Sequence, residues 1–195
     1  MPEVLQAFLV TFGVVFIAEL PDKTMFATIV LATRYRRPLA VVIGVTLAMV
    51  VHSVLAVIAG EALRRLPRTP TQLGVATLFL AGGVMLLRGD DETDEEVRAA
   101  PVRSDWGVIG RSALVIGVAE FGDFTQLATI GIVADRGYAV AVAAGSVVSH
   151  AVVAVVAVLA GGWLERRLPV RTVQRCAGVV FIVFGLLTAV SAIRG

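Results

Sequence analysis

The chain has 195 residues and a mean hydropathy of +0.88, with 57% apolar and 16% charged residues, whereas soluble domains average about 45–50% and about 25%. This composition excludes a disordered chain and argues against an ordinary soluble domain. The single cysteine, Cys176, excludes a disulfide scaffold and a cysteine-based metal cage. The net charge of +2, with basic residues clustered beside apolar runs, fits membrane orientation better than nucleic-acid binding.

Apolar runs predict an all-α, polytopic membrane protein with six transmembrane helices. The first six residues contain no basic cluster, so we expect the first helix to be retained rather than cleaved as a signal peptide. A continuous helix over 4–32 would be about 43 Å long, against a hydrocarbon core of about 30 Å, so this segment must tilt, break or project. The six predicted spans are 4–32, 38–60, 71–87, 106–133, 139–163 and 173–193.

The second half of the chain repeats the first. Ala18–Thr24 resembles Ala119–Thr125 at an offset of 101 residues, and Gly44 pairs with Gly145 at the same offset. Further matches at an offset of 102 join Arg64-Arg65-Leu66-Pro67, Gln72, Phe79 and Gly83 to Arg166-Arg167-Leu168-Pro169, Gln174, Phe181 and Gly185. We therefore expect a three-helix repeat over 1–87, an acidic cytoplasmic linker over 88–105, and a second repeat over 106–195.

Three spans per repeat is an odd number, so the second copy must be inverted in the membrane, as in many secondary transporters. Orientation follows from the arginines, because positive charge accumulates in cytoplasmic loops. Eleven arginines lie on the linker side and five on the side of the termini. This predicts a cytoplasmic linker, with both termini outside.

Each copy carries two carboxylates three residues apart, a spacing that places both on one helix face. They are Glu19 and Asp22 in the first copy, and Glu120 and Asp123 in the second, followed by Thr24 and Thr125. A charged side chain at the centre of a membrane helix costs about 2.5–3.5 kcal/mol, so such residues indicate function. Lys23, the one basic residue at that depth, cannot neutralise four carboxylates, but it is a candidate ion-pair partner for Asp22 or Glu120.

Pro21 and Gly122 occupy the same place in the two motifs and predict that both helices are interrupted there. Oxygen ligands without Cys or His in the motifs favour a hard cation such as Ca²⁺, Mn²⁺ or Mg²⁺. Gln126 and, as a weaker candidate, Met25 follow the two threonines and could add ligands. The divalent ion would be cargo, and we expect no cofactor.

The same carboxylates can bind protons, because burial and mutual repulsion favour the neutral acid whereas a bound dication favours the ionised form. Competition at one site, combined with alternating access, gives exchange of metal for protons. His52 and His150, in the second and fifth spans, are candidates for a proton relay or for hydrogen-bonded packing. The expected partners are a divalent ion, protons and lipid, with no nucleic acid, and a homo-oligomer is compatible with the sequence.

Glu19-Leu-Pro-Asp-Lys-Thr24 and Glu120-Phe-Gly-Asp-Phe-Thr125 resemble the doubled Glu-x-Gly-Asp-(Lys/Arg)-(Ser/Thr) signature of the Golgi-type manganese/calcium cation–proton exchangers. The resemblance extends over the whole chain and implies a bacterial member that exchanges Mn²⁺ or Ca²⁺ for H⁺, in the plasma membrane. It also implies that the four carboxylates and two threonines form the cation site. Pro21 and Phe124 depart from the signature, which puts ion preference and stoichiometry in question.

Three other functions share some of these features. A six-span exporter of small solutes such as amino acids has the same layout but needs no intramembrane carboxylates. A passive cation channel would conduct without proton coupling. A membrane-embedded metalloenzyme lacks a supporting motif, because adjacent Ser and His residues do not give the geometry of a nucleophile and base. We therefore expect a transporter and not an enzyme.

Overall fold

The computed structural model describes residues 2–20, 22–88, 104–167 and 170–194, and within these ranges it contains eight α-helices and no strand. The all-α class is therefore confirmed, whereas most of the predicted linker 88–105 lies outside the described residues. The helices are α1 (Glu3–Glu19), α2 (Lys23–Tyr35), α3 (Pro38–Leu63), α4 (Arg68–Arg88), α5 (Asp105–Ala119), α6 (Phe124–Arg136), α7 (Ala139–Arg167) and α8 (Val170–Arg194).

Local sequence explains several helix ends. Pro38 begins α3, where a missing backbone donor costs nothing. Ser104 caps α5 by accepting a 3.1 Å hydrogen bond from the Gly107 backbone N–H. Gly137, with φ of 72°, ends α6 in a backbone conformation that favours glycine. These signals place the helix ends close to the predicted span ends.

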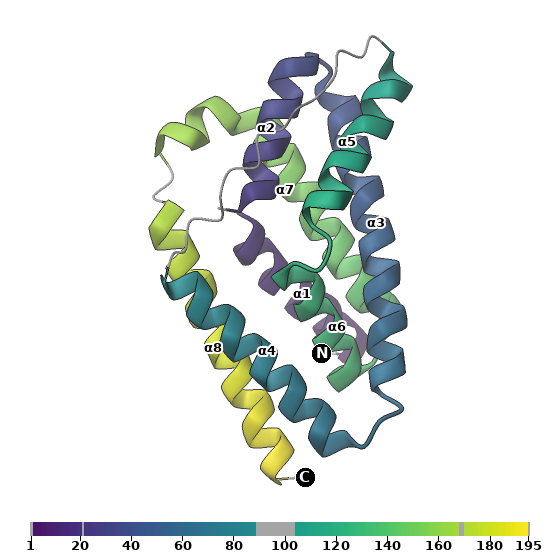
Figure 1. Cartoon of the computed structure of the whole chain (residues 1–195), viewed down its shortest axis with the longest axis vertical. Coiled ribbons are helices and arrows are strands. Elements are labelled where there is room, and N and C mark those ends of the chain that lie inside the picture. Colours follow the sequence, from purple (N-terminus) through teal and green to yellow (C-terminus); the bar gives the residue numbers. More distant parts are fainter. Residues whose placement is uncertain (1, 21, 89–103, 168–169, 195) are drawn as a thin grey trace.

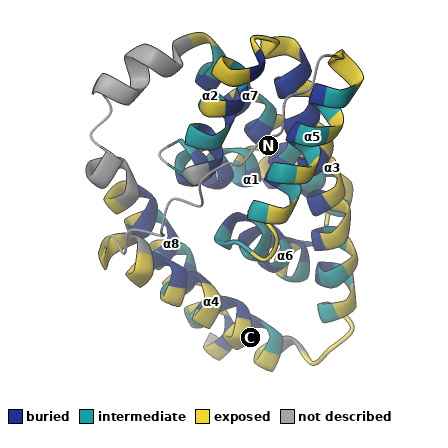
Figure 2. Cartoon of the chain, turned by 45° about the horizontal axis from the view of Figure 1, so that its top comes forward, coloured by how far each residue is buried: buried dark blue, intermediate teal, exposed yellow. Residues whose placement is uncertain are grey.

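Three helices are long and apolar enough to cross a membrane alone: Pro38–Leu63, Ala139–Leu159 and Arg175–Ile193. The helix pairs α1–α2 and α5–α6 are each bent at a short break, and counting each pair as one span gives five among the described residues. The remaining predicted span, 71–87, corresponds to α4 and stays a prediction. Figure 2 shows exposed residues along the outer faces of the helices, and on α3 these include Leu47, Val51, Val54 and Ile58. An apolar outer face of this extent fits contact with lipid.

Six of the helices form a bundle, and two further helices pack on each other and make fewer contacts with that bundle (Figure 1). Within the bundle α1 packs on α7, and α3 packs on α5, α6 and α7. Of the other helices, α2 packs on α7, α3 and α5, whereas α4 and α8 pack mainly on each other and lie along one side of the bundle. We call them the α4–α8 pair.

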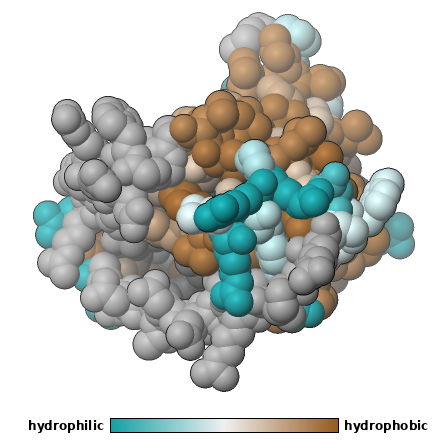
Figure 3. Space-filling model, turned by 90° about the horizontal axis from the view of Figure 1, so that it is seen from above, coloured by the Kyte–Doolittle hydropathy of each residue, from teal (hydrophilic) through white to brown (hydrophobic). Residues whose placement is uncertain are grey.

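The bundle has two chemically distinct ends. At one, the Tyr138 hydroxyl donates to the Glu3 carboxylate and the Arg64 side chain lies against Gly137; both chain termini point toward this end, which we call the terminal end (Figure 1). At the other, the linker end, Arg37 pairs with Asp105. Figure 3 looks onto the linker end and shows a band of hydrophilic residues beside a hydrophobic flank.

Two glycines allow close helix contacts that match across the repeat. A Cβ atom added at Gly44 would lie 2.5 Å from the Ile109 carbonyl oxygen, and one at Gly145 would lie 2.6 Å from the Phe8 carbonyl oxygen. Both the glycines and their contacts are related by the offset of 101 residues. Small residues at such crossings let helix backbones approach closely in a membrane.

We expect Gly44→Ala and Gly145→Ala each to lower stability by about 1–3 kcal/mol, because the added methyl group must displace backbone. Gly13→Ala is the matched control: nothing lies within 4 Å of its added Cβ, and alanine favours a helix interior by about 1 kcal/mol. Thermal unfolding in detergent measures the difference. Equal melting temperatures for all three variants would contradict it.

A candidate cation site at two broken helices

Both motifs interrupt their helices, which confirms the predicted breaks. The first pair, α1 and α2, is bent by 68° between Glu19 and Thr24, and the second pair, α5 and α6, by 75° between Ala119 and Phe124. Gly122 has φ of 81°, a left-handed conformation that glycine adopts without strain. Its counterpart Pro21 lies outside the described residues.

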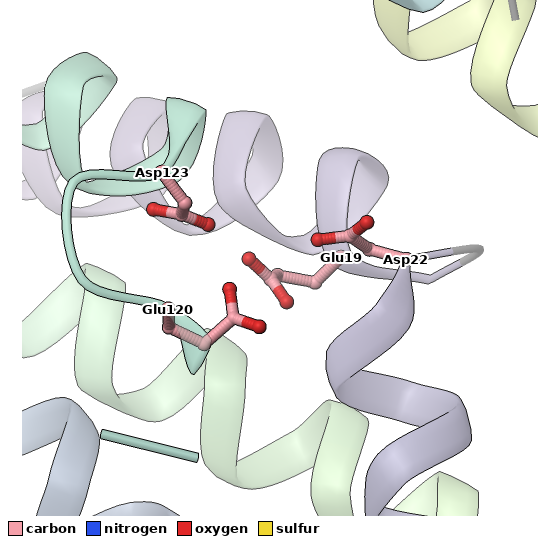
Figure 4. Close-up of side chains that lie close together, drawn as sticks. All are labelled: Glu19, Asp22, Glu120 and Asp123. Carbon is pink, nitrogen blue, oxygen red and sulfur yellow. The ribbon is translucent and has the colours of Figure 1, made fainter. Parts of the chain in front are cut away.

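The two breaks bring four carboxylates together. One carboxylate oxygen from each of Glu19, Asp22, Glu120 and Asp123 lies within 4.8 Å of the others. Figure 4 shows the four side chains converging from the α1–α2 break and from the α5–α6 loop. Glu19 and Glu120 are 0% and 2% exposed, so both residues are buried inside the bundle.

The buried glutamates have few hydrogen-bond donors around them. Among the described residues, no hydrogen bond reaches either oxygen of Glu120, and the close partner of Glu19 is the His150 ring, whose Nε2 lies 3.3 Å from Oε1. Leaving buried charge uncompensated costs several kcal/mol per ion. This donor set, with oxygens only, fits a hard divalent cation.

The second motif is held by a local network of hydrogen bonds. The Asp123 carboxylate accepts from the Gln126 backbone N–H at 2.8 Å and from the Thr125 hydroxyl at 3.0 Å. The Gln126 side-chain oxygen accepts from the Gly122 backbone N–H at 2.7 Å. Gln126 therefore supports the loop between α5 and α6 in this structure, a role that its sequence position did not indicate.

His150, on α7, lies directly beside the carboxylates. Its Nδ1 is 2.8 Å from the Ser146 carbonyl oxygen and its Nε2 is 3.3 Å from Glu19 Oε1. Because a carbonyl only accepts, Nδ1 must carry a hydrogen, and Nε2 faces the carboxylate. The contact is favourable when a proton is held by either His150 Nε2 or Glu19.

The other predicted residues differ in their surroundings. Met25 is fully buried in an apolar cluster with Val153 and Ala157. Lys23 begins α2, but its side chain is outside the described part of the structure, so its ion pairing stays a prediction. His52, on α3, contacts the Gly117 carbonyl oxygen at 2.9 Å.

A small cavity adjoins the carboxylates on the side of α3 and α7. Its polar lining includes His52, Ser53, Glu120, Asp123, Gln126, Ser146 and His150. Sequence reasoning did not select Ser146, although it precedes His150 by one helical turn. It also missed Asp135, whose carboxylate accepts a 2.9 Å hydrogen bond from the Gln72 side chain, because that pair joins different helices.

The fold and the site define a helical integral membrane protein with a buried, four-carboxylate cation site at two broken helices. A family model described as the divalent cation/proton antiporter GDT1 matches residues 7–94 and again residues 108–195. The chain belongs to this family. Membership indicates a cation transporter, and it agrees with the expectation that the chain is not an enzyme.

Curated relatives align over most of the chain. It is 31% identical to a GDT1-like protein of Synechocystis, over 94% of this chain and 97% of the relative. It is 30% identical to GDT1-like protein 5 of Arabidopsis thaliana, over 98% of this chain and 100% of the relative. A chloroplastic GDT1-like protein 2 of rice is 28% identical, and there the alignment covers 60% of the relative. No solved structure matches the chain significantly.

Proposed function

We propose that the protein exchanges Mn²⁺ or Ca²⁺ for protons by alternating access, with both motifs forming one cation site. One observation carries this proposal: four carboxylates from two broken helices converge, and Glu19 and Glu120 are fully buried among them. A divalent cation compensates this charge, and protons compensate it when the cation leaves. The metal is cargo, and we propose no resident cofactor.

The proposed ligands are the oxygens of Glu19, Asp22, Glu120 and Asp123, with the hydroxyls of Thr24 and Thr125. The Thr125 hydroxyl donates its hydrogen to Asp123, which leaves its lone pairs available for a cation. Gln126 and Met25 are weaker candidates, since the Gln126 oxygen already accepts from Gly122 and Met25 lies in an apolar cluster. His150, in contact with Glu19, is the candidate for carrying an exchanged proton.

The packing of the α4–α8 pair supports alternating access. This pair contacts α1 and α6, the two half-helices that run from the site toward the terminal end. Among the described residues, α8 makes no contact of that extent with α2, nor α4 with α5. Among the described residues, the α4–α8 pair therefore packs against the half-helices on the terminal side of the site more than against those on the linker side, as expected for one of two alternating states.

We further propose that the two halves are inverted repeats spanning the membrane six times. The separate family matches at 7–94 and 108–195 and the paired contacts of Gly44 and Gly145 support this arrangement. The excess of arginine at the linker side supports a cytoplasmic linker with both termini outside. The cyanobacterial relative supports a bacterial protein, which we place in the plasma membrane.

Purified protein in sealed vesicles tests this function. With a pH-sensitive dye inside, Mn²⁺ or Ca²⁺ added outside is expected to enter while the lumen becomes more alkaline, and Mg²⁺ serves for comparison. Protein-free vesicles control for leakage. Metal conductance without a pH change would indicate a channel instead, and flux of amino acids without metal would indicate a solute exporter.

A further inference from the structure

The two broken helices do not end at the same point of their motifs. In the first copy, α1 includes the motif glutamate Glu19, and the Leu20 backbone N–H bonds to the Phe16 carbonyl oxygen at 3.1 Å. The equivalent bond in the second copy, at an offset of 101 residues, would join Phe121 to Gly117. Instead α5 ends at Ala119, and the Phe121 N–H bonds to the Val118 carbonyl oxygen at 3.3 Å.

This earlier ending takes the second motif glutamate out of the helix. Glu120 is the C-cap residue of α5, with φ and ψ of −95° and 3°. The Gly117 carbonyl therefore lacks the N–H that its counterpart in the first copy has. An unsatisfied backbone group inside a membrane costs several kcal/mol, so a donor is needed at this position.

The missing donor comes from another helix. His52 Nε2, on α3, is 2.9 Å from the Gly117 carbonyl oxygen, and the acceptor requires that Nε2 carries a hydrogen. The ring is 7% exposed and meets the Phe121 ring edge-on, with centroids 6.1 Å apart. The residue that corresponds to His52 in the second copy is Val153, which has no side-chain donor. The donor is thus present only where a helical bond is missing.

His52 is also close enough to the site to influence it. His52, Glu120 and Asp123 line the same small cavity. The helix that carries His52 is unbroken and packs on α5, α6 and α7, so it offers a fixed point against which the α5–α6 loop is held.

We propose that His52 is a positioning residue for the cation site. Its Nε2–H replaces the lost helical N–H at Gly117 and holds the turn from which Glu120 reaches the other carboxylates. This inference rests on the proposed function for its effect on metal binding, but its effect on the loop does not depend on that function. The required property is a hydrogen-bond donor at Nε2, which needs no change of protonation state, and this separates the role from that of a proton relay.

Three variants separate the donor from the ring: His52→Gln keeps an N–H donor, whereas His52→Leu and His52→Met remove it. We expect the two donor-free variants to weaken Mn²⁺ binding about tenfold by calorimetry, the effect of one hydrogen bond, and His52→Gln to stay within about threefold of the wild type. The same order is expected for the Mn²⁺ concentration that gives half-maximal exchange. Thr46→Val is the control, because Thr46 lies on the same helix, its hydroxyl donates to the Val42 carbonyl oxygen one turn earlier at 2.8 Å, and it is outside the lining of the cavity.

Hydrogen exchange of the metal-free protein tests the loop without reference to transport. Backbone amides of residues 117–123 are expected to exchange faster in His52→Leu and His52→Met than in the wild type, with His52→Gln close to the wild type. Thermal unfolding establishes that each variant is folded. Two results would overturn the proposal. One is a hydrogen-exchange rate at residues 117–123 equal to that of the wild type in both donor-free variants, and the other is a loss of Mn²⁺ affinity in His52→Gln equal to that in His52→Leu. Failure of the wild type to bind metal would instead reject the proposed function. The hydrogen-exchange measurement would still decide the role of His52 in the loop.

Discussion

Glu120→Gln is expected to reduce metal-driven proton exchange by at least about 100-fold, and Glu19→Gln to do the same. Even residues that only orient metal ligands cost about 10–100-fold when changed, and these carboxylates are proposed ligands. An amide oxygen keeps the size of the side chain but removes the negative charge that a hard divalent cation requires. Proton exchange is lost as well, because an amide does not titrate in the working range.

The same variants are expected to leave the fold intact. Removing the buried Glu120 charge relieves a desolvation cost and its repulsion from the neighbouring carboxylates. Metal-free Glu120→Gln should therefore unfold at the same temperature as the metal-free wild type or at a higher one, whereas Glu19→Gln also loses the contact with His150 and should not gain stability. Added Mn²⁺ should raise the melting temperature of the wild type, since a ligand that binds only the folded state stabilises it, and should leave both variants unchanged.

Glu61→Gln is the matched control for both measurements. Glu61 pairs with Arg64 on α3 and is 42% exposed in its side chain, so its charge is remote from the proposed site. It should exchange metal for protons like the wild type. Normal exchange in Glu19→Gln or Glu120→Gln would contradict the four-carboxylate site itself.

The sequence predicted the parts of this site that depend on periodicity and on residue chemistry. The offset of 101 residues located both motifs, and the Glu-to-Asp spacing with Pro21 or Gly122 between them predicted interrupted helices. Gly44 and Gly145 were recognisable as a pair because the repeat preserves them. These features are local in each copy, so a pattern within one chain was sufficient to find them.

Contacts between separate segments of the chain could not be predicted from the sequence. Gln126 was expected to be a candidate ligand, but its side-chain oxygen accepts from Gly122, because the α5–α6 loop turns back over the first turn of α6. The role of His52 depends on a missing backbone bond at Gly117, which no residue type reveals. The unequal packing of the α4–α8 pair is a property of one conformation, whereas the sequence is common to all conformations.

One hydrogen bond lies where the α4–α8 pair contacts the terminal side of the bundle. Gln72 on α4 is 4% exposed and donates to Asp135 on α6. Nearby, Val75 and Phe79 of α4 pack against Gly131 of α6, where an added Cβ would lie 2.8 Å from Val75. If alternating access requires the pair to leave α6, this contact must separate in every cycle.

Cross-linking α4 to α6 at this contact is therefore expected to stop exchange. In a Cys176→Ser background, Gln72→Cys with Asp135→Cys should be joined by a bifunctional thiol reagent that contains a reducible disulfide and should lose nearly all flux, and a reducing agent should restore it. The control is Leu80→Cys with Gly185→Cys, which joins α4 to α8 where Gly185 already lies against Leu80; that pair moves as one unit, so flux should persist. Continued metal–proton exchange by the protein cross-linked between positions 72 and 135 would show that α4 and α6 stay together throughout the cycle. Access to the carboxylates would then change through another movement of the bundle.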